Sequence, residues 1–213
     1  MLNRAILIFS KSADHGTVKT RLRSVISDED CLYLTMALLQ DTIAKSLFID
    51  ADRYLYLSGS GQLTFSPLIP VELQVGRDLG ERMHNAFEKK LQHYGKVLIV
   101  GVDSPFFPPK IFDEAFDALD SHDVVLGPAE DGGYYLIGMK ELLPEIFSNI
   151  PWGASSVLAR TLRTLAIRRV MLLAPAFDID EPKDLERFKS ELAISDATYL
   201  QHCREWIKRF SNQ

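Results

Sequence analysis

Cysteine is scarce in this sequence. Its 213 residues include only Cys31 and Cys203, which lie far apart and lack the spacing of a metal-binding motif. Such cysteines are typical of reduced, partly buried thiols. We therefore expect a cytoplasmic protein that does not depend on a zinc cluster.

Long apolar runs are also missing. The N-terminal segment MLNRAILIFSKS contains an apolar run of five residues, which is too short for the hydrophobic region of a signal peptide. No segment approaches the roughly 20 apolar residues that span a bilayer, and the sequence shows no internal repeat or low-complexity tract. The sequence thus predicts no membrane span.

Positive charge is not in excess. The formal net charge is −5, which argues against a general nucleic-acid-binding protein, because such proteins carry basic surfaces that neutralise phosphates. The Walker pattern G-x-x-x-x-G-K-[ST] is absent as well. His84 and His93 have no Ser or carboxylate arranged with them in a recognisable triad.

What the sequence does contain is an ordinary globular composition, with 46% hydrophobic and 25% charged residues. Short apolar runs alternate with amphipathic segments, and this alternation predicts an α/β domain over 1–213, with a mostly parallel sheet and helices on both faces. The expected strands are 5–9, 53–57, a short one near 73, 97–100, 124–126, 134–137 and 170–173. The expected helices are 27–46, 78–94, one from 108, 142–147, 155–165, 182–192 and 196–210.

The segment from Lys96 to Met139 is the most informative. Val97–Val100 is a continuous apolar run that ends at Gly101 and predicts a strand buried on both faces. Asp103 follows at once. Because ligands in open α/β sheets bind beyond the carboxyl ends of the strands, Asp103 is a candidate site residue. The alternative is that it caps the following turn.

A second acidic turn follows the next strand. Glu130, Asp131, Gly132 and Gly133 stand between two apolar runs. Two consecutive glycines predict a positive φ or the close approach of a ligand. We expect Asp131 to lie near Asp103, at a neighbouring strand end.

The loop after the first strand carries Gly16, Lys19 and Arg21. Backbone N–H groups and cations in such a loop can hold phosphates. The competing interpretation, a surface loop with solvated cations, is about equally compatible with the sequence.

Three further aspartates have two interpretations each. Asp78 is either the N-cap of the following helix or a ligand-binding residue. Asp178 and Asp180 either cap the helix that begins near Pro182 or join Asp103 in binding a divalent cation. Mg²⁺ or Mn²⁺ accepts one or two carboxylates together with substrate phosphates, so a metal between Asp103, one later Asp and a diphosphate fits the pattern.

Six motifs then indicate a family. In order along nearly the whole chain they are GTVKTRL (16–22), DLGERM (78–83), GVDSP (101–105), LGPAEDGGYYLIG (126–138), PW (151–152) and DIDEP (178–182). The chain resembles the DUF2064 family of nucleotide-diphospho-sugar transferase-like proteins. It is also similar to molybdenum-cofactor and phospholactate guanylyltransferases.

The resemblance implies a GT-A-type, Rossmann-like sheet with a nucleotide in a cleft at the strand ends. It places Gly16, Lys19 and Arg21 at the phosphates and Gly80 near the base or ribose, and it makes Asp78 a further nucleotide- or phosphate-binding candidate. The metal would lie between Asp103 and Asp180, with Asp178 as the reserve ligand. Asp103, Glu130 and Asp131 become the catalytic candidates, and Gly132, Gly133 and Trp152 lie on the acceptor side.

The sequence departs from both groups of relatives. Metal-dependent GT-A glycosyltransferases often carry Asp-x-Asp, whereas Asp103 is followed by Ser104-Pro105. The first loop is sparser in glycine than in nucleotidyltransferases. Two reactions therefore stay open: glycosyl transfer from a nucleotide sugar to a small acceptor, which the family label favours, and nucleotidyl transfer from a nucleoside triphosphate to a phosphorylated substrate. A non-catalytic nucleotide-binding module is the third alternative.

Overall fold

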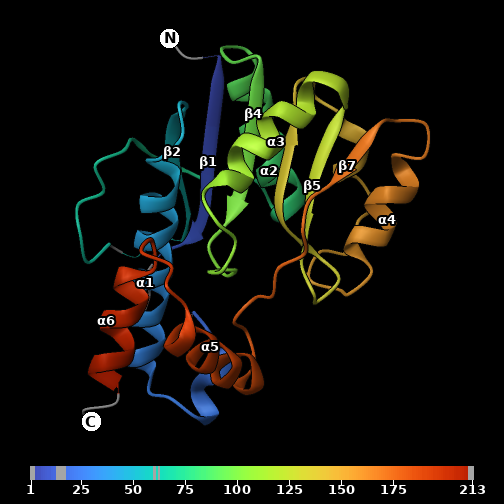
Figure 1. Cartoon of the computed structure of the whole chain (residues 1–213). Helices are drawn as coiled ribbons and strands as arrows, with labels where there is room; N and C mark the ends of the chain where they lie inside the picture. The colour runs from blue at the N-terminus through green and yellow to red at the C-terminus, as the bar shows by residue number, and fades with distance from the viewer. Residues whose placement is uncertain (1–2, 13–17, 60, 62, 211–213) are drawn as a thin grey trace.

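The computed structural model describes residues 3–12, 18–59, 61 and 63–210 (Figure 1). Its centre is a seven-stranded sheet with the order β3-β2-β1-β4-β6-β5-β7. The strands are β1 (Arg4–Lys11), β2 (Asp52–Ser58), β3 (Val71–Leu73), β4 (Lys96–Gly101), β5 (Val124–Pro128), β6 (Tyr134–Met139) and β7 (Val170–Leu172).

All pairings in the sheet are parallel except those of β6, which is antiparallel to both β4 and β5. β5 and β6 form a hairpin, with a register shift at Gly127/Pro128. The apolar run of β1 is buried on both sides, as its lack of polar alternation predicts. The predicted mostly parallel α/β sheet is confirmed.

One face of the sheet is covered by α1 (Asp28–Ser46) and α3 (Lys110–Ser121). Ser27 is the N-cap of α1, since its Oγ accepts a hydrogen bond from the Asp30 backbone N–H at 3.0 Å. One apolar stripe of α1 is buried against β1 and β2. Its members are Leu32, Met36, Leu39 and Ile43.

The opposite face is covered by α2 (Leu79–Leu91), the 3₁₀ helix η2 (Pro144–Phe147) and α4 (Val157–Thr164). Met83 and Phe87 of α2 pack against Leu7 and Ile99 of the sheet within the same apolar cluster. The prediction of helices on both faces is therefore confirmed.

Two C-terminal helices, α5 (Pro182–Ile194) and α6 (Gln201–Phe210), form a further layer on α1, away from the sheet (Figure 1). α6 begins at Gln201, five residues later than predicted. The Ala197 N–H bonds to the Ser195 side chain, and a turn bond joins the Leu200 N–H to Ala197. Those local bonds replace the expected first helical turn.

None of the helices in the described part of the chain combines the length and the apolar composition that crossing a bilayer requires.

Candidate active site

The sheet reverses its direction of growth between β1 and β4. From β1 the chain adds β2 and β3 on one side, and β4 then pairs with the other side of β1. This is a topological switch point, where open α/β sheets bind ligands at the carboxyl ends of their strands. A cleft of about 360 Å³ lies there, lined by the last residues of β1 and by the segment that follows β4.

The two halves of the cleft differ in chemistry. The half toward β1, β2 and α2, called here the acid-free half, is lined mainly by uncharged side chains, including Phe9, Ser58, Gln74 and Leu79, together with the cations Lys11 and Arg82. The other half carries both cationic and anionic groups: Lys19, Asp103, Asp178 and Asp180. The cleft therefore suits a ligand with an uncharged end and an anionic end.

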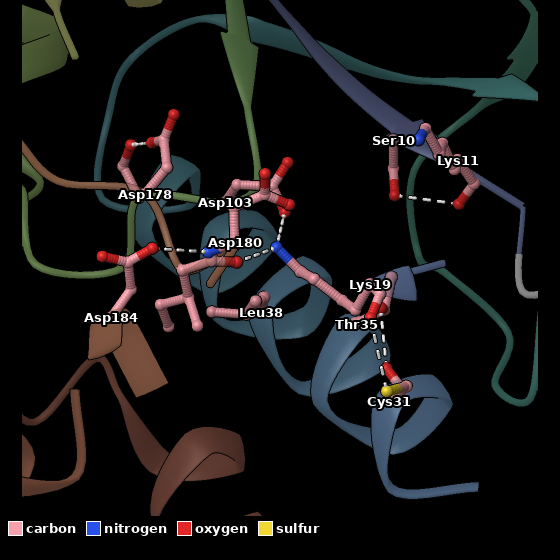
Figure 2. Close-up of polar contacts among 12 residues, drawn as sticks. Ser10, Lys11, Lys19, Cys31, Thr35, Leu38, Asp103, Asp178, Asp180 and Asp184 are labelled. Atoms are coloured by element: carbon pink, nitrogen blue, oxygen red, sulfur yellow. Dashed lines mark hydrogen bonds and ion pairs between the residues drawn. The ribbon is translucent and has the colours of Figure 1, made fainter. Parts of the chain in front are cut away.

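Lys19 is at the centre of the charged half (Figure 2). Its backbone lies in the left-handed region, with φ 48°, and only 6% of its side chain is exposed. Nζ donates hydrogen bonds to the Asp103 carboxylate and to the Ile179 carbonyl oxygen. We expected an exposed lysine, and this is wrong: Lys19 ties the first loop to both acidic segments.

Arg21 stays near the surface, with 64% of its side chain exposed. Its Nη1 donates to Asp180 Oδ2 at 2.7 Å. The loop therefore places one buried and one exposed cation beside the two acidic segments. Gly16, the third phosphate-binding candidate, lies outside the described residues.

Asp178 is half-buried and accepts a hydrogen bond from the Ser104 hydroxyl. Burial raises the pKa of Asp178 to about 7; the Ser104 hydrogen bond opposes this rise, and the negative charges of Asp103 and Asp131 add to it. Asp178, the reserve candidate of the sequence, is thus the acid with the most perturbed environment in the cleft. Asp180, the first choice, is exposed.

These residues fit a divalent cation that binds together with a ligand. Within the described ranges, no three acidic, histidine or cysteine side chains converge into a preformed metal site. Asp103 and Asp178 are nevertheless close enough for the charge of Asp103 to raise the pKa of Asp178, and a cation would relieve that repulsion. Mg²⁺ needs only one or two carboxylates when phosphates supply the remaining ligands.

The loop that carries Asp103 is supported from beneath by Lys45 of α1. Lys45 is fully buried, and its Nζ donates to the Pro105 carbonyl oxygen at 3.0 Å and lies 3.6 Å from the centre of the Phe107 ring. Burial lowers the pKa of Lys45 to about 7, partly opposed by the negative charge of Asp41. A buried, closely packed amine thus holds the loop in place.

A second pocket, of about 390 Å³, shares Asp178 and Asp180 with the cleft. The β5–β6 turn and the start of α5 form its other walls. Six carboxylates and two cations line it: Glu130, Asp131, Asp178, Asp180, Glu181 and Asp184, with Arg21 and Lys183. The second pocket is therefore strongly acidic, whereas the cleft is nearly balanced in charge.

The turn between β5 and β6 is held by local contacts. Glu130 is ion-paired with Arg187 of α5 at 2.7 Å, and Asp131 Oδ1 accepts a hydrogen bond from the Gly133 N–H at 2.8 Å. Gly132 has φ +91°, and a Cβ there would collide with the Ser155 carbonyl oxygen. The predicted positive φ is thus found at Gly132 and not at Gly133. The group that lies close to Gly132 is the backbone of Ser155.

Three other candidates have structural contacts. Asp78 is the N-cap of α2 and accepts from the Glu81 N–H at 2.9 Å. A Cβ on Gly80 would collide with the Trp152 ring, which also packs edge-on against Tyr134 at 6.4 Å. Asp78, Gly80 and Trp152 are not among the described residues that line the cleft or the second pocket. They support these sites through α2 and β6.

Sequence reasoning missed most of the residues that line the cleft, among them Lys11, Gln74, Arg82 and Ser104. Lys11 ends β1, so the rule that singled out Asp103 could have found it. Arg82 belongs to the DLGERM motif, and its Nε donates to the Gly76 carbonyl oxygen at 3.1 Å. Gln74 follows a three-residue edge strand and had no signal in the sequence.

Comparison with solved structures supports this architecture. A Desulfovibrio desulfuricans G20 protein, proposed by its name to be a nucleotide-diphospho-sugar transferase, is 29% identical to this chain. The two superpose with a TM-score of 0.86 over 99% of each chain.

More distant structures share the fold. The inositol-1-phosphate CTP transferase of T. maritima is 13% identical, with a TM-score of 0.54 over 95% of each chain. Rv0371C of Mycobacterium tuberculosis H37Rv, in complex with manganese, is 13% identical, with a TM-score of 0.55 over 86% of this chain and 96% of that one.

Comparison with curated proteins gives no significant match. The model of DUF2064, a family described as uncharacterized proteins conserved in bacteria, matches residues 34–154. This match covers more than half of the sequence and includes four of the six motifs, from DLGERM through GVDSP and LGPAEDGGYYLIG to PW. The chain belongs to the DUF2064 family.

Proposed function

We propose that this protein is a transferase that uses a nucleotide-activated donor, and that it transfers the glycosyl group of a nucleotide sugar to a small acceptor with the help of Mg²⁺ or Mn²⁺. One observation carries the proposal: a cleft whose acids all lie in one half opens at the switch point and shares its acidic wall with a second pocket. The name of the D. desulfuricans relative agrees with it.

The donor would lie along the cleft. Its base would occupy the acid-free half, where Phe9 and Leu79 offer apolar surface, and its diphosphate would lie in the half that carries Lys19 and the aspartates. Lys19 and Arg21 would face the phosphates in exchange for part of their present bonds to Asp103 and Asp180. Asp103, with Asp180 or Asp178, would hold the metal, which supplies charge neutralisation at the departing diphosphate.

The acceptor would occupy the second pocket. Its hydroxyl oxygen would form a bond to the anomeric carbon of the sugar while the bond from that carbon to the diphosphate oxygen breaks. The hydroxyl proton would pass to a carboxylate of the pocket. Asp131 is the better candidate for this base, because Glu130 is ion-paired with Arg187.

The charge of the second pocket favours glycosyl over nucleotidyl transfer. A nucleotidyltransferase that joins a nucleotide to a phosphorylated substrate must bind that substrate beside the donor, and six carboxylates against two cations would repel its phosphate. A neutral polyhydroxyl or a cationic acceptor meets no such repulsion. We therefore expect acceptors without phosphate.

Nucleotidyl transfer is the second candidate, because Asp103 is followed by Ser104, whose hydroxyl bonds to Asp178 in place of a second metal-binding carboxylate. Product analysis separates the two reactions. The protein would be incubated with Mn²⁺, a panel of nucleotide sugars or nucleoside triphosphates, and neutral, cationic or phosphorylated acceptors. Release of a nucleoside diphosphate supports glycosyl transfer, and release of pyrophosphate supports the alternative.

Binding without any product across the panel would favour a non-catalytic module. A preceding thermal-shift screen would identify the donor, since a ligand at 100 times its dissociation constant stabilises a protein by about 2.7 kcal/mol. No stabilisation by any nucleotide or nucleotide sugar, with or without metal, would contradict the proposed function.

A further inference from the structure

Gln74 lies just after β3 and lines the acid-free half of the cleft. Its backbone N–H donates to the Leu57 carbonyl oxygen at 2.8 Å. Its side-chain nitrogen, Nε2, donates to the carbonyl oxygens of Ser10 at 3.0 Å and of Tyr56 at 2.9 Å. The side chain is therefore anchored to the ends of β1 and β2.

These two bonds fix the orientation of the amide. A primary amide has two N–H donors, and both are used on carbonyl oxygens. Turning the amide over would place Oε1 against those oxygens and leave all three acceptors unpaired. In the described part of the chain no hydrogen bond reaches Oε1, so the free polar atom of this cleft-lining side chain is an acceptor and not a donor.

The surroundings suit a flat, uncharged group. Phe9 lines the cleft and stacks on Tyr56 with a centroid separation of 5.3 Å, and Leu79 adds apolar surface at the start of α2. In a nucleotide the base is the flat, uncharged part, and its edge carries N–H donors as well as carbonyl and ring-nitrogen acceptors.

We propose that Gln74 determines base specificity by accepting a hydrogen bond from an N–H group of the donor's nucleobase at Oε1. A base that turns an N–H toward Gln74 satisfies the fixed acceptor. A base that turns a carbonyl oxygen there leaves two acceptors unpaired, which weakens binding. The inference rests on the proposed function for the presence of a nucleotide, but the choice of residue rests on the amide geometry.

The test compares calorimetric binding of CDP, UDP, ADP and GDP to the wild type and to Gln74→Met, which keeps the length of the side chain and removes its acceptor together with the two N–H donors to Ser10 and Tyr56. We expect the wild type to prefer one base within a cytosine–uracil or adenine–guanine pair by about tenfold, the value of one good hydrogen bond. Gln74→Met should reduce this preference to less than about threefold. Affinity for inorganic pyrophosphate, which has no base, should not change.

Gln92→Met is the matched control. Gln92 is exposed at the far end of α2, roughly 20 Å along the helix from the cleft at 1.5 Å per residue. It should keep the base preference of the wild type.

A second measurement needs no variant. Methylating every hydrogen-bonding N–H on the edge of the preferred base should weaken binding to the wild type by about tenfold and binding to Gln74→Met hardly at all. The inference is overturned if Gln74→Met keeps the wild-type preference, or if the wild type tolerates the methylated base. Failure of the wild type to bind any nucleotide would instead overturn the proposed function, and this inference with it.

Discussion

The cleft and the second pocket share one wall and differ in what stands opposite it. In the cleft, Asp103, Asp178 and Asp180 face Lys11, Lys19 and Arg82, so three acids meet three cations. In the second pocket six acids meet two cations. A balanced site suits an anionic ligand that brings a metal with it, whereas an acidic site suits a neutral or cationic ligand. Asp178 and Asp180 thus line both a site that favours an anionic ligand and a site that favours a neutral or cationic ligand.

The sharpest test of the comparison is Asp103→Asn. Asparagine keeps an oxygen that can accept from Lys19 but loses the charge that a metal requires. We expect turnover of the nucleotide sugar to fall at least about 100-fold and the metal-dependent gain in nucleotide affinity to disappear, with little change in melting temperature.

The control for this variant is Asp117→Asn. Asp117 is an exposed acid of α3 that pairs with Arg4, and its substitution should leave both readouts unchanged. Equal nucleotide binding by the wild type in chelator and in Mn²⁺ would show that the cleft does not use its carboxylates for a metal.

Gly132→Ala probes the turn that forms the wall of the second pocket. With φ +91° and the Ser155 carbonyl oxygen in the place of a Cβ, alanine should lower the free energy of unfolding by about 3 kcal/mol. Gly133→Ala is the matched control, because its φ is outside the left-handed region and its Cβ would meet only the Asp131 side chain, at 3.1 Å. Urea denaturation that finds equal losses for the two variants would mean that the turn is not held against Ser155.

Substitutions of the two cations of the first loop, Lys19 and Arg21, test its contributions to stability and to nucleotide binding separately. Lys19→Met removes two charge-assisted hydrogen bonds of a buried side chain and should lower both nucleotide affinity and the free energy of unfolding, the latter by about 2 kcal/mol. Arg21→Ala removes an exposed cation and should lower affinity only. Calorimetry and chemical denaturation measure the two effects. Unchanged affinity in both variants would mean that the loop does not face phosphates.

Lys45→Met tests the support beneath the Asp103 loop. The pKa of Lys45 is about 7 in the folded protein against 10.5 for an ordinary lysine, so the unfolded chain binds more protons there between these two pH values. The stability of the wild type should therefore gain up to about 1.4 kcal/mol per pH unit from this residue as pH rises from about 7 to about 10.5. Below about pH 7 both states are protonated and the contribution is constant.

Urea denaturation at pH 7.5, 8.5 and 9.5 measures this slope, and the slope of Lys45→Met should be flatter than that of the wild type by this amount. Lys208→Met, at an exposed lysine of α6, should keep the wild-type slope. Parallel slopes for the wild type and Lys45→Met would show that the buried amine keeps its proton.

Local sequence patterns were sufficient to predict the strands and helices of the fold. Continuous apolar runs identified the strands, because a strand covered on both faces excludes polar residues, and Ser27 and Asp78 marked helix starts by cap chemistry. The family motifs and the position of Asp103 after a buried strand were likewise evident in the sequence. The strand before Asp178, β7, is instead an edge strand in which Met171 and Leu172 are exposed. The antiparallel direction of β6 was not evident in the sequence, because an apolar run predicts a buried strand but does not indicate in which direction the strand runs.

Contacts between distant segments decided the rest. Lys19 looks like a surface cation in the sequence, and only the approach of Asp103 and Ile179, 84 and 160 residues away along the chain, makes it a buried anchor. The same holds for Glu130, which finds Arg187 on α5, and for Gln74, whose amide is oriented by carbonyls at the ends of two other strands. The sequence determines which groups each strand end presents, but burial and pairing depend on what the sheet brings beside them, and local patterns do not contain that information.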